Sequence, residues 1–187
     1  MSEIPSDFRT ALESLRGHEL RTEITLREIP GPTRLAPYAA ALNAEIAGSE
    51  DALAGHGTFV VLYDPAGQGA WHGDFRIIVM VKAPMDEEVA SDPLLGEVGW
   101  SWLMSSLDDA GAGFHHASGT VTRVLSESFG GLQLFSQSVE MEIRGSWTPN
   151  TTDLGPHLQA WLGLLETSAG LDPLPRILPA HGRTNLH

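Results

Sequence analysis

The chain contains no cysteine, which excludes disulfide bonds, thiolate nucleophiles and cysteine-ligated zinc. Its 11 Lys and Arg residues stand against 24 Asp and Glu residues. The resulting net charge of −13 disfavours binding to a phosphate backbone, which requires clustered positive charge. No apolar run approaches the roughly 20 residues that cross a bilayer, and the first residues lack the basic start and apolar stretch of a signal peptide. These absences predict a cytoplasmic protein that binds neither a membrane nor, directly, nucleic acid.

The length and composition are those of a globular protein. A chain of 187 residues with 42% hydrophobic residues can bury a sizeable core. The sequence shows no internal boundary and no low-complexity segment, so we expect a single α+β domain over residues 1–175. Prolines then recur, and residues 176–187 are expected to form an extended tail.

Hydrophobic periodicity predicts three helices and about five to six strands. Alternation with period two indicates strands over residues 19–29, 58–63, 75–82, 115–125 and 138–148. Apolar residues at helical spacing, with capping residues before them and glycines after them, indicate helices between Ser6 and Gly17, Asp92 and Gly111, and Asp153 and Gly170.

Residues 35–47 are ambiguous, because their alanines favour a helix whereas their alternation fits a strand. A strand is preferred here, since the two strands that follow need antiparallel neighbours. The predicted order is therefore α-β-β-β-β-α-β-β-α, an α+β fold with a mainly antiparallel sheet.

Residues 92–104 form the densest apolar block of the chain and belong to the middle helix. At about 100° per residue, this helix has two apolar sides. One side is expected to lie on the sheet and consists of Leu94, Leu95, Val98 and Trp102. The other side needs a cover, either another helix of the same chain or a partner protein, and this candidate partner surface consists of Trp100, Leu103, Met104 and Leu107.

No catalytic, cofactor-binding or metal site can be assembled from the sequence. Adjacent histidines on a strand point to opposite faces, so His115 and His116 are poorly placed to chelate one ion. A polar pocket around His72, Asp74, His115 and His116 is nevertheless an alternative worth testing. Charged side chains of the last two strands also form a candidate polar ligand face, made of Arg123, Glu140, Glu142 and Arg144.

Several strings of the sequence together resemble an uncharacterised actinobacterial family, number 3000 among the domain families of unknown function. The resemblance runs from Phe8 to about Pro175. It implies a cytoplasmic protein without an established activity, so it assigns no functional residues. The strings are Arg34-Leu35-Ala36-Pro37-Tyr38-Ala39, Asp64-Pro65-Ala66-Gly67-Gln68, Asp92-Pro93-Leu94-Leu95, Glu97-Val98-Gly99-Trp100-Ser101-Trp102-Leu103, Ala117-Ser118-Gly119-Thr120-Val121-Thr122-Arg123 and Ser146-Trp147-Thr148-Pro149.

Three functional hypotheses follow. The leading one is a non-enzymatic protein-binding or adaptor protein that acts as a dimer or with a protein partner. The second is an enzyme or small-ligand-binding domain that uses the polar pocket described above. The third comes from the resemblance alone, which implies gene neighbours for a ribonuclease D-like enzyme, and it is an accessory role in a ribonuclease-linked RNA pathway. No cofactor is expected under the leading hypothesis.

Overall fold

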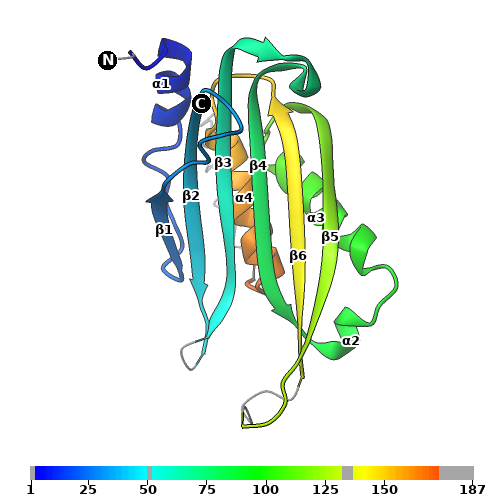
Figure 1. The fold of residues 1–187 in the computed structure, drawn as a ribbon. Helices are drawn as coiled ribbons and strands as arrows, with labels where there is room; N and C mark the ends of the chain where they lie inside the picture. Colours follow the sequence, from blue (N-terminus) through cyan, green and yellow to red (C-terminus); the bar gives the residue numbers. More distant parts are fainter. Residues whose placement is uncertain (1–2, 50–51, 132–136, 173–187) are drawn as a thin grey trace, which may run out of the picture.

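The structure is a computed structural model that describes residues 3–49, 52–131 and 137–172. Its centre is one antiparallel sheet of six strands in the order β1-β2-β3-β4-β6-β5. Figure 1 shows this sheet with α3 and α4 packed behind it. The strands are β1 (Ile24–Ile29), β2 (Tyr38–Ala47), β3 (Leu53–Gln68), β4 (Gly73–Met85), β5 (Phe114–Glu127) and β6 (Gln137–Pro149). The helices are α1 (Ser6–Glu13), the short 3-10 helix η1 (Gly69–Trp71), α2 (Glu87–Ala90), α3 (Leu95–Asp109) and α4 (Gly155–Ser168).

The α+β class and the mainly antiparallel sheet predicted from the sequence are confirmed. The ambiguous segment at residues 35–47 forms strand β2, as preferred, and pairs with both β1 and β3. The four-residue helix α2 was not predicted, because one turn carries no measurable periodicity. The predicted tail at residues 176–187 lies outside the described residues. In the described residues, no helix is long and apolar enough to cross a membrane.

One face of the sheet, which we call the helix face, carries the main core. Along β3, β4 and β6 every second residue points to it, from Phe59 to Trp147. Helix α4 covers the middle strands, where Trp161 is fully buried against Phe59 at a ring distance of 5.5 Å. Glycines make room for the bulky helix side chains, because a Cβ at Gly57 would meet both the Trp161 indole and the β4 backbone.

Helix α1 closes one corner of the helix face. Phe8 is buried and stacks on Tyr63 at 5.8 Å, with Tyr38 close by. Just after α1, the hydroxyl of Ser14 accepts a hydrogen bond of 2.8 Å from the Leu154 N–H at the start of α4. Capping of one helix by a residue 140 positions away joins the two ends of the chain.

The second face, which we call the open face, has no helix against it among the described residues. The connection between β1 and β2 crosses in front of β2 and β3 in Figure 1. Consistent with such a cover, Ala41 and Leu62 are only 3% and 2% exposed although both point to the open face. Ion pairs occupy other parts of this face, including Arg27 with Glu45 at 3.0 Å.

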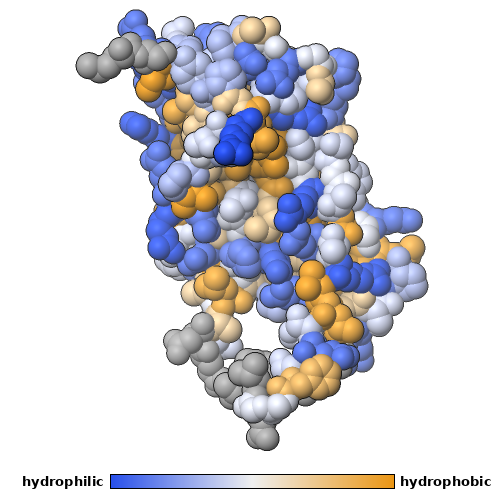
Figure 2. Space-filling view, viewed as in Figure 1, coloured by the Kyte–Doolittle hydropathy of each residue, from blue (hydrophilic) through white to orange (hydrophobic). Residues whose placement is uncertain are grey.

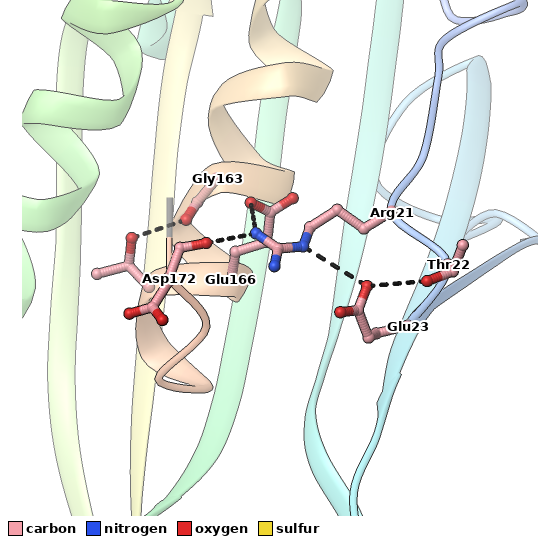
Figure 3. A network of polar contacts seen from close by, with 7 residues as sticks. Arg21, Thr22, Glu23, Gly163, Glu166 and Asp172 are labelled. Carbon is pink, nitrogen blue, oxygen red and sulfur yellow. Dashed lines mark hydrogen bonds and ion pairs between the residues drawn. The ribbon is translucent and has the colours of Figure 1, made fainter. Parts of the chain in front are cut away.

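Arg21, immediately before β1, holds the sheet edge to the end of α4 (Figure 3). Its Nη1 donates to the Asp172 carbonyl at 2.6 Å and lies 3.7 Å from the Glu166 carboxylate. Its Nε lies 3.6 Å from the Glu23 carboxylate. The arginine side chain is only 11% exposed, so water screens these contacts little.

We expect Arg21→Met to lower the free energy of unfolding by about 1–3 kcal/mol, because it leaves a half-buried carboxylate and a carbonyl without their cation. Arg27→Met is the matched control. Arg27 makes a shorter ion pair but is 61% exposed, and its loss should cost under about 1 kcal/mol. Urea denaturation measures both, and equal losses would contradict a role for Arg21 as an anchor.

Candidate functional site

The structure buries two of the four residues of the candidate partner surface on α3. Leu103 and Leu107 are both fully buried. Leu103 lies against Gly145 of β6, where a Cβ would come within 2.6 Å of the leucine methyl. These two residues therefore cannot serve a partner in the folded protein, and the prediction for them is wrong. Trp100 and Met104 are half-buried against the same core.

The physical reason is the position of Gly99. Leu95, Gly99, Leu103 and Leu107 form the buried stripe of α3, and this stripe combines residues from both sides assigned by the helical phase. A Cβ on Gly99 would lie 3.3 Å from Val121 and 3.4 Å from Ile143, so the glycine is where the helix touches the sheet. Trp100 then lies over Gly119 of β5 on one flank of the stripe.

Two residues of the side that the sequence assigned to the sheet are exposed, although Leu95 of the same side is buried. Leu94 is 56% exposed and Val98 is 36% exposed. Nine large apolar side chains are exposed in the described part of the chain, and five of them fall between positions 89 and 129. We call these five the hairpin-end patch: Val89, Leu94, Val98, Leu125 and Phe129.

One of these five residues, Leu125, lines a hollow of about 530 Å³ between α2, the end of β5 and the start of β6. Arg123 spans it, donating a hydrogen bond to the Asp92 carbonyl. Figure 2 shows the open face in front, where apolar side chains in orange and charged ones in blue lie next to one another at this end of the molecule. The hollow is lined by Glu87, Glu88, Ala90, Ser91, Arg123, Leu125 and Val139.

Acidic residues predominate near the patch, although the lining of the hollow also contains Arg123. Residues 83–122 contain no Lys or Arg, and they hold seven of the 24 acidic residues. Five of these seven precede or begin α3, namely Asp86, Glu87, Glu88, Asp92 and Glu97, and all five are exposed. Apolar side chains surrounded by carboxylates are the complement of a basic, amphipathic segment.

The candidate polar ligand face is divided between the two faces of the sheet. Glu142 and Arg144 lie on the open face, where they pair with each other, and Glu140 pairs there with Lys82 at 3.0 Å. Arg123 pairs with Met141 in the strand register and therefore points to the helix face. The four residues do not converge on one site, because residues of odd and even number alternate between faces.

His72 and His116 lie closer together than regular strand geometry would predict. A bulge between His115 and Ser118 puts His116 at φ +52°, and His72 sits at φ +54° after η1. The rings of His72 and His116 stack at 3.7 Å. Asp74, the fourth residue of the predicted pocket, lies beside Gly67 of β3.

Arg76 lies against these histidines, and the sequence analysis did not identify it. We call the group of Arg76, His72, His115 and His116 the histidine corner. Its Nε donates to Ser146 Oγ at 2.7 Å, and its Nη1 donates to the His116 carbonyl at 2.9 Å and to Thr148 Oγ1 at 3.0 Å. Burial lowers the pKa of Arg76, whose side chain lies flat across β6. The feature of the sequence that could have identified Arg76 is its position as an arginine within the otherwise apolar central strand β4. In the described residues, no group of three or more His, Asp or Glu is placed to hold a metal ion.

A single antiparallel sheet with helices packed on one face defines a two-layer α+β protein. The chain belongs to the family described as "Protein of unknown function (DUF3000)", whose model matches residues 4–178. Comparison with curated proteins gives no match, and comparison with solved structures gives none either.

Proposed function

We propose that the protein is a non-enzymatic protein-binding protein whose hairpin-end patch takes up a basic, amphipathic segment of a partner protein. The observation that carries this proposal is the hollow whose lining combines the exposed Leu125 with the carboxylates of Glu87 and Glu88. Leu94 and Leu125 are each 56% exposed, and exposed apolar clusters of this kind are typical of interaction sites.

The acidic charge of the patch favours binding of a different protein over binding of a second copy of this chain. Two copies meeting through this surface would bring Glu87, Glu88 and Asp92 of each chain together, and like charges in contact cost several kcal/mol. Nucleic acid would be repelled for the same reason. A segment with Lys or Arg flanking apolar residues satisfies both the carboxylates and the exposed leucines.

The hollow can accommodate apolar side chains of the partner. The hollow between α2 and the β5–β6 ends has Leu125 and Val139 on one wall and Ala90 on the other, with Glu87 and Glu88 at its edge. Arg123 is the one cation within it, and it is already bonded to the Asp92 carbonyl. Apolar contacts would supply most of the affinity, and the carboxylates would select basic sequences.

Selection of short random peptides displayed on phage tests this proposal. We expect peptides enriched on the wild-type protein to carry Lys or Arg and apolar residues at helical spacing. Leu125→Ser should weaken their binding by about tenfold or more, because it removes a central apolar contact. Raising the salt concentration from about 0.05 M to about 0.5 M should weaken it further by screening.

Leu35→Ser is the matched control. Leu35 is 54% exposed, nearly the same as Leu125, but it lies in the β1–β2 connection. The control should bind the selected peptides like the wild type. Enriched peptides without positive charge, or equal binding by both variants, would contradict the proposal.

A further inference from the structure

The histidine corner contains a buried cation that lacks a counter-ion. Arg76 is 9% exposed, and its hydrogen-bond acceptors are two hydroxyls and a carbonyl, all of them uncharged. Within the described part of the chain, no carboxylate lies within 4.0 Å of the guanidinium, and Nη2 has no hydrogen-bond partner. A buried charge without an opposite charge is costly, so an anion there would be stabilising.

His115 lies beside this group, and both of its ring nitrogens contact oxygen atoms. Its Nδ1 lies 2.6 Å from Asn150 Oδ1 and its Nε2 lies 3.0 Å from the His72 carbonyl oxygen. A neutral imidazole has one N–H and can donate to only one of these oxygens, whereas the imidazolium donates to both. These two acceptors accordingly raise the pKa of His115.

The surface of the corner consists of imidazole rings. His72 and His116 are exposed and stacked, and the left-handed backbone at both residues holds them there. The nearest acidic residue along β4, Asp74, has its carboxylate beside Gly67 on the β3 side, away from β6 and β5. A buried arginine beside three imidazoles is unexpected in a chain of net charge −13.

We propose that the histidine corner is a binding site for a small oxyanion, the phosphate or carboxylate group of a ligand, held by Arg76, His72 and His116. A guanidinium offers paired N–H donors that match the oxygens of both groups. The imidazoles add N–H donors from the bulge of β5 and the end of η1. The site is separate from the hairpin-end patch and does not depend on it.

Histidine ring signals in NMR spectra of the full chain test the proposal. Sodium phosphate and sodium acetate are titrated separately at constant ionic strength, set with sodium chloride. We expect the His72 and His116 signals to shift and to saturate below about 10 mM of at least one of the two anions. Saturation by phosphate alone assigns the site to phosphorylated ligands, and saturation by acetate alone assigns it to carboxylates.

Two arginine variants distinguish anion binding at the histidine corner from a general effect of anions on the charged surface. Arg76→Gln should weaken anion binding by about tenfold, the usual effect of losing a charged hydrogen-bond donor. Arg144→Gln removes an exposed arginine from the same face and should leave binding unchanged. If Arg76→Gln fails to fold, His116→Gly replaces it, because glycine adopts the positive φ freely and should still weaken binding several-fold. Shifts that never saturate, or equal effects of the Arg144 and corner variants, would overturn the proposal.

Discussion

Trp161→Ala should lower the free energy of unfolding by about 3–5 kcal/mol, the range for removing a large aromatic from a core. Trp161 is fully buried between α4 and the middle strands, beside Phe59. Its indole N–H also donates to the Met80 carbonyl at 3.3 Å. For a chain of this length, the loss corresponds to a fall in Tm of roughly 6–20 °C.

Trp71→Ala is the control for this substitution. Trp71 lies in η1 and is half-buried, and the contact it makes with Thr148 uses its backbone carbonyl, which the substitution keeps. Calorimetry should show a fall in Tm less than half as large as for Trp161→Ala. Equal falls would mean that α4 does not anchor the core as the packing indicates.

The stability of the protein should fall in acid because of His157. This residue is 1% exposed, and its Nδ1 accepts a hydrogen bond of 2.9 Å from the Trp147 indole. Burial lowers the pKa of His157 from 6.5 to about 4. The unfolded chain therefore binds a proton more readily than the folded one between these two pH values.

The sign follows directly. The stabilisation from His157 is complete above about pH 6.5 and is lost as the pH falls to about 4, a change of about 3 kcal/mol. His157→Gln keeps an acceptor for the indole N–H but cannot be protonated in this range. Urea denaturation from pH 7 to pH 4 should show a steeper loss for the wild type than for His157→Gln. Parallel curves would contradict a neutral, buried His157.

The strands were predictable from the sequence because their alternation reflects burial directly. In β6, Met141, Ile143 and Trp147 are buried and Arg144 is exposed, as the period-two pattern indicates. The middle helix was less predictable. Its apolar residues nearly surround it, and the contact with the sheet is centred on Gly99, which a hydrophobicity pattern does not count.

The candidate sites depended on features that a linear pattern lacks. The approach of His116 to His72 requires a bulge and two left-handed residues, and neither is coded by residue type alone. Arg76 reaches residues 40 to 72 positions away. The hollow at the hairpin end similarly combines residues of α2, the end of β5 and the start of β6, which lie far apart in the sequence.

The most direct test of the proposed function is zero-length carbodiimide crosslinking in native lysate, which joins carboxylates to lysines in contact. Wild-type protein, Leu125→Ser and Leu35→Ser are captured in parallel, and the crosslinked residues are located by mass spectrometry. We predict crosslinks from Glu87, Glu88 and Asp92 to lysines of one partner in the wild type and in Leu35→Ser, and their loss in Leu125→Ser. Crosslinks confined to other carboxylates, or unchanged in Leu125→Ser, would contradict a protein-binding role for the hairpin-end patch.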